Sequence, residues 1–473
     1  MSRADFMAIL PLLVLSTTMI VAMLVSAFYR RHGAVMAIVQ LGLMLAFAAL
    51  WPADAQVPRR VTTLLMVDRY ALLFGGLILV ASIGVATLAY GYLRRAHRPE
   101  EFYLLLLAAS LGGLVLASSN HFASLFLGLE LLSVSLFGLI AYPIAHWRPL
   151  EAGIKYLILS GTASALLLFG MALIYAELGT LQFEHISIAA STEPSHSKVV
   201  IAGMVLILGG IAFKLSVVPF HMWVGDVYEG APAPVGAYLA TVSKGAVFVM
   251  LLRFLPEAGL YGKPALLWIL TLMAVASMLI GNLLALLQTH LKRLLGYSSV
   301  AHLGYLLVIL VAGGPLATEA AAFYLTAYFV TLLGAFGVIT LLSDEQGDND
   351  ALAEYRGLFW RRPWVAGVLS ITMLSLAGIP VTMGFVAKFY AVAAGIERAQ
   401  WLLVATLIVA SAIGLYYYLR ILIALFSARG RTTIVATPSY SWSGALVVVA
   451  AGLLLLVIGA YPVPLINLFH GAL

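Results

Sequence analysis

The chain of 473 residues is 63% hydrophobic and only 10% charged, and its mean hydropathy is +1.04. Soluble domains carry about 25% charged residues, so this sequence has too little polar surface for a soluble protein. It contains no cysteine, which excludes disulfides, thiol nucleophiles and cysteine-ligated iron–sulfur clusters in this chain. It also has no phosphate-binding glycine loop, dinucleotide-binding motif or paired-histidine metal motif, so we expect no cofactor and no metal in this chain.

The net charge of +6 and the isoelectric point near 9.3 are compatible with nucleic-acid binding or with membrane topology. The basic residues lie in short loops between long apolar segments, as membrane insertion requires. No basic face remains for a nucleic acid once the helices lie in lipid. We therefore expect the lipid bilayer, and no nucleic acid, as a partner.

The apolar segments predict an all-α integral membrane protein. A helix needs about 20 apolar residues to cross the hydrocarbon core, and these runs are continuously apolar rather than alternating as in a β-barrel. The first run lacks a convincing cleavage site, so we interpret it as a retained helix rather than a signal peptide. From the N-terminus onward, about fourteen transmembrane helices are predicted to begin near Phe6, Val35, Tyr70, Phe102, Phe122, Ala152, Val199, Pro234, Leu266, Tyr297, Ala320, Trp364, Leu402 and Ser443.

The loop charges predict the orientation, because basic residues concentrate in cytoplasmic loops. Loops after odd-numbered helices are richer in Lys and Arg, so we expect them to be cytoplasmic and both termini to be periplasmic. We interpret the acidic start of the long cytoplasmic loop at 343–362, with Asp344, Glu345, Asp348 and Asp350, as a solvated loop. The odd-numbered loops hold Arg30, Arg31, Arg94, Arg95, Arg98, Arg148, Lys292, Arg293, Arg356, Arg361, Arg362, Arg429 and Arg431, and the others hold Arg3, Arg59, Arg60, Arg69, Lys198, Lys263 and Arg398.

The sequence also contains a faint internal repeat. KLSVVPFHM at 214–222 in helix 7 resembles SLAGIPVTM at 375–383 in helix 12, and Ser133 with Gly138 in helix 5 corresponds to Ser299 with Gly304 in helix 10. Each pair is five helices apart, an odd number, so the second copy would be inverted in the membrane. We predict flanking helices 1–3 at 1–101, a first five-helix repeat (helices 4–8) at 102–254, a second (helices 9–13) at 265–428 and helix 14 at 440–473.

Each copy of this repeat contains a proline inside a helix. Pro219 and Pro380 each remove a helical hydrogen bond, which would free the carbonyls of Leu215 and Leu376. Inside a membrane such breaks persist where protein or a water-filled cavity satisfies the freed groups. We expect helices 7 and 12 to be discontinuous; plain kinks are the alternative.

Four charged residues lie inside predicted helices: Glu130, Lys214, Lys244 and Lys388. A charge at the bilayer centre costs about 2.5–3.5 kcal/mol on insertion scales, so such residues mark functional sites. A structural ion pair between Glu130 and Lys214 is one alternative, but one glutamate cannot neutralise three lysines. Interfacial snorkelling is an alternative for Lys388. We predict a proton relay through these four residues.

Other residues are weaker candidates for the relay. His221 and His302 lie inside predicted helices, where a lone histidine serves either as a packing residue or as a proton carrier. Arg420 is either an interfacial anchor or a functional charge. Asp226 and Glu229 are expected beyond helix 7, where a loop role is favoured over a proton exit.

Several segments resemble a known family. They are FKLS at 213–216, PFHMW at 219–223, DVYEGAP at 226–232, TVSK at 241–244 and LKRLLGYSS at 291–299. They are similar to the proton-conducting antiporter-like membrane subunits, which occur in bacterial respiratory complex I, an NADH-quinone oxidoreductase, and the similarity runs over nearly the whole chain. M-type subunits tend to carry a glutamate where Lys388 stands, and L-type subunits have a long lateral C-terminal helix, whereas this chain stops at Leu473. Both features favour the N type.

The resemblance implies a function. Glu130 would pair with Lys214 and tune its proton affinity, Lys244 would be the central relay, and Lys388 would deliver the proton toward the outer side. FMN, iron–sulfur clusters, NADH and quinone would be bound by partner subunits. The partners would include other antiporter-like and small membrane subunits of the complex in the bacterial inner membrane.

Two other functions remain open. The chain could be a subunit of a multi-subunit cation/proton antiporter of the same fold, which would have small membrane partners without redox cofactors. It could also be a membrane scaffold, in which case neutralising the buried charges would leave activity intact.

Overall fold

The computed structural model describes residues 2–94, 98–142, 147–192, 197–343, 347–428 and 441–472. Five charged residues of the predicted loops (Arg95, Asp344, Glu345, Arg429 and Arg431) lie outside the described residues, as do both ends of the predicted 440–473 segment. Two short antiparallel strands, β1 (Arg59–Arg60) and β2 (Met66–Val67), interrupt an otherwise helical chain. The α-helices are α1 (Arg3–Ala8), α2 (Leu10–Phe28), α3 (His32–Ala48), α4 (Leu50–Asp54), α5 (Arg69–Tyr92), α6 (Glu100–Ala117), α7 (Phe122–Ile140), α8 (Trp147–Leu178), α9 (Phe183–Thr192), α10 (Ser197–Leu215), α11 (Val224–Gly230), α12 (Ala233–Tyr238), α13 (Lys244–Glu257), α14 (Pro264–Leu286), α15 (Leu291–Ala312), α16 (Pro315–Leu342), α17 (Leu358–Arg361), α18 (Pro363–Ala377), α19 (Met383–Glu397), α20 (Trp401–Phe426), α21 (Trp442–Ala460) and α22 (Val463–Ala472).

The predicted membrane spans are confirmed. Within the described residues, 13 helices are long and apolar enough to cross a membrane, and the shorter apolar helix α18 lies just before α19. Counting α18 and α19 together as one interrupted span gives the predicted helix 12. The observed starts lie within several residues of the predicted ones; α15 shows a six-residue difference, since it begins at Leu291 and not near Tyr297.

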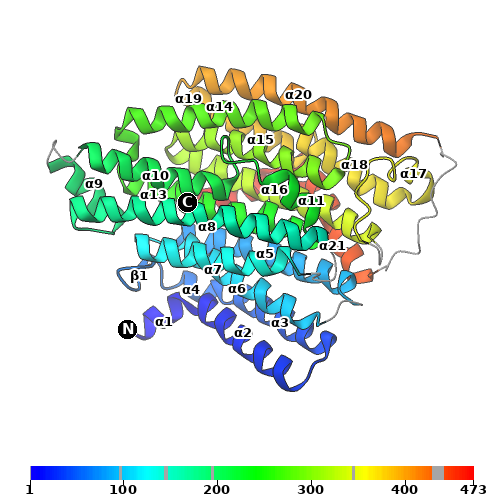
Figure 1. Ribbon diagram of the computed structural model, residues 1–473, viewed down its shortest axis with the longest axis horizontal. Coiled ribbons are helices and arrows are strands. Elements are labelled where there is room, and N and C mark those ends of the chain that lie inside the picture. Colours follow the sequence, from blue (N-terminus) through cyan, green and yellow to red (C-terminus); the bar gives the residue numbers. More distant parts are fainter. Residues whose placement is uncertain are drawn as a thin grey trace.

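The helices form one elongated bundle in which they run roughly side by side (Figure 1). The first helices, α2 and α3, lie at one edge of this view, and α19 and α20 lie at the opposite edge. Neighbouring pairs along the chain pack against each other, among them α6 on α7 and α14 on α15. The chain therefore builds the bundle largely from antiparallel neighbours joined by short connections.

Burial divides the bundle into a centre and a periphery. The most apolar window of the span Ala233–Glu257 is 100% buried, as is that of Leu291–Ala312, whereas the corresponding window of Leu10–Phe28 is only 22% buried. The two fully buried spans carry Lys244 and His302. Two of the predicted site residues therefore lie at the centre of the bundle, enclosed by other helices of the same chain.

The two predicted breaks are present. Helix α10 ends at Leu215 and α11 begins only at Val224, while α18 ends at Ala377 and α19 begins at Met383. Both breaks contain left-handed backbone, at Ser216 (φ 58°) in the first and at Gly378 (φ 80°) and Val381 (φ 71°) in the second. A left-handed residue stops a helix, because its backbone cannot continue the right-handed turn. Helices 7 and 12 are therefore discontinuous and not merely kinked.

A third irregularity was not predicted. The span Ala233–Glu257 begins as α12, passes through a π-helical turn at Leu239–Ser243, and continues as α13. The turn ends directly before Lys244. Such turns insert one extra residue and are frequent at functional sites. The turn therefore sets the direction in which the Lys244 side chain leaves the helix.

The interpretation of the 343–362 loop as solvated is wrong for its described acidic residues. The Asp348 carboxylate lies 2.6 Å from the Lys292 ammonium, and both side chains are almost fully buried. Asp350 is also buried, and His290 lies 3.2 Å from its carboxylate. Because α15 begins earlier than predicted, Lys292 stands on its first turn and draws the acidic segment inward. This loop is anchored to the bundle by a buried ion pair.

Candidate functional site

Glu130 and Lys214 lie on α7 and α10, which both pack against α8. Ser164 of α8 donates a hydrogen bond to the Glu130 carboxylate. The Lys214 ammonium donates to Ser160 of α8 (2.5 Å) and to Ser133 of α7 (2.7 Å). Ser160 and Ser164 are four residues apart and therefore lie on one face of α8. This face holds the carboxylate and the ammonium next to each other.

The structure holds this pair through serine hydroxyls. Among the described residues, no nitrogen–oxygen contact of 4.0 Å or less joins Glu130 to Lys214, although the two groups are electrostatic neighbours. A pair of this kind changes its interaction energy when α7, α8 or α10 shifts, since no direct salt bridge fixes its separation.

Lys244 occupies the most enclosed position of the three lysines. Its side chain is only 2% exposed, and its ammonium donates hydrogen bonds to Ser216 and Ser299. Ser216 is the left-handed residue at the first break, and Ser299 belongs to α15. The rings of Trp223 and Tyr228 lie 5.9 and 5.2 Å from the ammonium, at cation–π distance. Lys244 therefore connects the first break to the second half of the chain.

Lys388 reaches back across the second break. From α19 its ammonium donates to the carbonyl of Ala377 (2.9 Å), the last residue of α18, and to Ser411 of α20 (2.8 Å). The Tyr305 ring lies 5.3 Å away. The sequence predicted a freed carbonyl at Leu376, and Lys388 binds the carbonyl of the next residue, Ala377, at the end of the helix. Lys388 is buried and does not snorkel to the interface.

None of the three lysines has an acidic ion-pair partner among the residues that the structure describes. Each is held by oxygen atoms of serines or of the backbone. An ammonium group can only donate hydrogen bonds, whereas a serine hydroxyl can donate and accept. These sites can therefore accommodate a lysine that gains or loses a proton, which is the chemistry of a proton relay.

His302 lies on α15 between the central lysine and the second break. Its Nδ1 is 2.8 Å from the Tyr324 hydroxyl, and its Nε2 is 3.3 Å from the Tyr418 hydroxyl. The ring also stacks on Tyr328, with centroids 5.3 Å apart. Both ring nitrogens therefore have hydroxyl partners.

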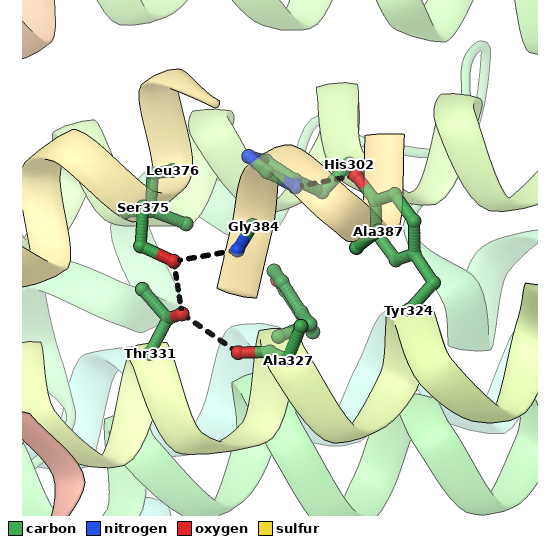
Figure 2. A pocket seen from close by; sticks show the side chains of 9 residues that line it. His302, Tyr324, Ala327, Thr331, Ser375, Leu376, Gly384 and Ala387 are labelled. Atoms are coloured by element: carbon green, nitrogen blue, oxygen red, sulfur yellow. Dashed lines mark hydrogen bonds between the residues drawn. The ribbon is translucent and has the colours of Figure 1, made fainter. Parts of the chain in front are cut away.

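A small cavity opens beside this histidine (Figure 2). His302, Tyr324, Thr331 and Ser375 line it, and its volume of about 10 Å³ is room for about one water molecule. Ser375 bonds to Thr331 (3.0 Å) and accepts a hydrogen bond from the Gly384 amide (3.2 Å), across the break between α18 and α19. Tyr328 also lines the cavity. The cavity therefore connects the histidine to the second break.

His221 lies in the first break, and the structure does not join it to the lysines. It is buried, and its Nδ1 has no hydrogen-bond partner. Among the described residues, no hydrogen bond or ion pair connects it to Lys214 or Lys244. A role for His221 in the relay stays a prediction.

The other charged candidates have structural partners. The Arg420 guanidinium donates to the carbonyls of Leu286 and Gln288, so it caps the C-terminal end of α14. Asp226 binds Lys155 (2.8 Å) and Arg293 (3.1 Å).

These contacts attach the short helix α11 to its neighbours. The hydrogen bond from Lys155, and then the charge of Arg293, hold the pKa of the Asp226 carboxyl below its ordinary value. Arg293 also binds Glu229 of α11 (2.9 Å). Asp226 and Glu229 therefore lie in an ion-pair network between α8, α11 and α15, rather than in a free loop.

Sequence reasoning missed the uncharged members of the site. Ser133 and Ser299 stand out in the sequence only as repeat markers, and the charge pattern does not point to Ser160, Ser164 or Ser216. A four-residue serine spacing in an apolar helix was the available signal, since hydroxyls on one face can bind a charge on a neighbouring helix. The tyrosines around His302 gave no signal, because their partners come from distant segments.

The chain belongs to a known family. The family model described as NADH:quinone oxidoreductase/Mrp antiporter, transmembrane, matches residues 119–414. The chain is 50% identical to NADH-quinone oxidoreductase subunit N of Ectopseudomonas mendocina (strain ymp), with 98% of this chain and 96% of that protein covered.

Solved structures share the fold. A chain of respiratory complex I from Thermus thermophilus is 33% identical, with a TM-score of 0.82 over 97% of this chain and 98% of that one. A chain of the Mrp complex from Dietzia sp. has a TM-score of 0.88 at 21% identity over 100% of this chain and 97% of that one. A chain of the membrane-bound sulfane sulfur reductase, an archaeal respiratory membrane complex, has a TM-score of 0.84 at 24% identity over 99% and 96%. The last two likenesses show the fold alone.

Proposed function

We propose that this chain is the N-type proton-translocating subunit in the membrane arm of a respiratory NADH-quinone oxidoreductase. The family model covers both NADH:quinone oxidoreductase and Mrp antiporter subunits, so the relative at 50% identity, and not the family, supports this assignment over a cation/proton antiporter, whose solved structure is 21% identical. The observation that carries the proton function is the set of three buried lysines that form no direct ion pair with an acidic side chain of the described residues and are each held by hydroxyl or carbonyl oxygens. A lysine inside the membrane costs free energy, so lysines of this kind mark functional sites.

The relay begins at the Glu130–Lys214 pair. A shift of the carboxylate toward Lys214 strengthens the binding of a proton to that lysine, and a shift away weakens it. The α8 serines hold both groups and leave the distance between them free to change. Lys244 then takes up the proton at the centre of the bundle, and Lys388 passes it toward the outer side. His302 lies between these two lysines as an intermediate carrier.

This chain works as part of an enzyme but carries no redox chemistry itself. NADH, FMN, the iron–sulfur clusters and quinone bind to partner subunits, and electron transfer there drives the relay here. The membrane partners are further antiporter-like subunits and small subunits of the same arm. The complex lies in the bacterial inner membrane, and we place both termini of this chain on the periplasmic side, because its odd-numbered loops are the more basic ones.

The function is tested by replacing Lys214 with alanine in the assembled complex. Proton uptake into inverted membrane vesicles and NADH-quinone turnover should both fall by about 100-fold if a proton carrier is lost. The exposed Lys198 on the same helix is the matched control, and Lys198→Ala should leave both rates unchanged. Normal pumping in both Lys214→Ala and Lys244→Ala would show that the buried lysines belong to a scaffold. Co-purification of small membrane partners without flavin or iron–sulfur centres would instead favour the antiporter.

A further inference from the structure

The imidazole of His302 is held at both ring nitrogens by tyrosine hydroxyls. Tyr324 of α16 lies at Nδ1 (2.8 Å), and Tyr418 of α20 lies at Nε2 (3.3 Å). All three side chains are buried, so bulk water does not compete for these contacts. The two tyrosines come from two different helices that both pack against α15. The ring is therefore fixed in orientation while both of its proton-binding atoms remain in contact with an exchangeable O–H group.

This arrangement satisfies every protonation state of the ring without rotation. In a neutral imidazole one nitrogen donates and the other accepts, and in the cation both donate. A tyrosine hydroxyl can donate or accept, so Tyr324 and Tyr418 fit both neutral tautomers and the cation. A backbone carbonyl or a carboxylate at the same place would accept only and would favour one tautomer.

Each tyrosine also lies next to a further group on the side away from the histidine. The Tyr418 hydroxyl hydrogen-bonds to Ser298, the neighbour in sequence of Ser299, which receives a hydrogen bond from Lys244. Tyr324 lines the cavity that reaches Thr331 and Ser375 at the second break (Figure 2). The two hydroxyls thus connect the histidine to Ser298 on one side and to the cavity on the other.

We propose that Tyr324 and Tyr418 are proton-relay residues that carry protons to and from opposite nitrogens of His302. The proposal rests on the function assigned to the buried lysines. A transported proton enters at Ser298, which passes its own proton to Tyr418, and the Tyr418 O–H bond breaks as an N–H bond forms at Nε2. The proton on Nδ1 moves to Tyr324, which passes its own proton to a water molecule in the cavity. One proton enters and one leaves, every group ends neutral, and the ring does not turn during this passage, which leaves His302 protonated on Nε2 instead of Nδ1.

The chain provides a matched control on the same helix. Tyr417 is the neighbour of Tyr418 and is equally buried, but its hydroxyl donates to Asn282 (2.9 Å), and among the described residues it makes no hydrogen bond to His302. Tyr417→Phe and Tyr418→Phe both remove one buried hydroxyl from α20. A difference between them therefore reports the position of the hydroxyl and not the loss of a polar contact in general.

The experiment compares Tyr324→Phe, Tyr418→Phe and Tyr417→Phe in the intact complex, in inverted vesicles. We expect the first two to lower the rate of NADH-driven proton uptake by about tenfold or more and to enlarge its solvent deuterium isotope effect, because a hydroxyl proton carrier is lost. Tyr417→Phe should stay within about twofold of the unaltered chain and keep its isotope effect. A purely structural role would not change the isotope effect.

Three outcomes are decisive. If Tyr324→Phe and Tyr418→Phe pump with the rate and isotope effect of Tyr417→Phe, the tyrosine relay is wrong. If both Lys214→Ala and Lys244→Ala pump normally, the assigned function fails as well; if Lys244→Ala is impaired while both tyrosine variants are normal, only the present inference fails. Should a tyrosine variant not assemble, Ser298→Ala replaces it, and an unchanged rate and isotope effect in that variant would overturn the proposal.

Discussion

The two broken helices hold their lysines in different ways. At the first break, Lys214 lies before the interruption and binds two serine hydroxyls, and Lys244 binds Ser216 within it and one further serine. At the second break, Lys388 lies after the interruption and binds the carbonyl of Ala377. The same local device, a helix stopped inside the membrane, therefore presents different oxygen atoms in the two halves.

The difference has a chemical meaning. A carbonyl only accepts a hydrogen bond and has no proton to donate to the lone pair of a neutral amine, so at Lys388 only the Ser411 hydroxyl can do so. A hydroxyl can turn and donate to the lone pair of a neutral amine, so the first break fits both protonation states of its lysines. Among the described residues, Lys214 and Lys244 thus have two hydroxyl partners each, whereas Lys388 has one hydroxyl partner and one carbonyl partner.

The largest test of this comparison is Lys244→Arg. The guanidinium keeps the positive charge and the reach of the side chain but does not release its proton in proteins. If Lys244 works by exchange, proton uptake should fall by about 100-fold, as far as in Lys244→Ala. Proton uptake in vesicles measures both variants. Retained pumping in the arginine variant alone would mean that Lys244 serves as a fixed charge.

Removing a serine hydroxyl should lower proton pumping more at the first break than at the second. Ser216→Ala removes one of the two hydroxyls at Lys244, and a hydrogen bond to a charged group contributes about 1.5–3 kcal/mol, so pumping should fall by about tenfold. Ser411→Ala should have a smaller effect on pumping, because Lys388 keeps the Ala377 carbonyl. Equal losses in the two variants would remove the distinction between the breaks.

The smallest effect concerns how the first half holds its serines in place. Gly170 of α8 packs against α10, and an added Cβ would lie 2.6 Å from the carbonyl oxygen of Gly203. Gly170→Ala should destabilise the chain by about 1–3 kcal/mol through overpacking. Gly161 on the same helix has no atom within 4 Å of the added Cβ, so Gly161→Ala is the control. Thermal unfolding of the purified complex in detergent measures both, and equal midpoints would contradict the close packing.

The sequence was sufficient for the features that follow from hydrophobicity and backbone chemistry. Continuous apolar runs predicted the spans, and the segments around Pro219 and Pro380 predicted both interruptions. The four intramembrane charges were found because lipid makes them costly, and the structure places all of them within or beside the core of the bundle. Their role as a relay stays a prediction that the experiments above address.

The rest could not be read from the sequence because it depends on which helices meet. Ser160 and Ser164 look like ordinary small residues of a membrane helix until α7 and α10 are seen on either side of α8. Asp348 belongs to a polar loop, and only the early start of α15 brings Lys292 to it. The hydroxyls around His302 come from α16 and α20, and no spacing along the chain joins them.

The π-helical turn before Lys244 has a consequence for anyone who compares this helix with another by its angular pattern. A regular α-helix advances about 100° per residue, so one inserted residue rotates everything after it by that angle. A helical wheel drawn continuously through Ala233–Glu257 therefore assigns the residues of α13 to the wrong side of the cylinder. The residues that share a face with Lys244 are neighbours in space although the wheel separates them. α12 and α13 therefore need separate wheels.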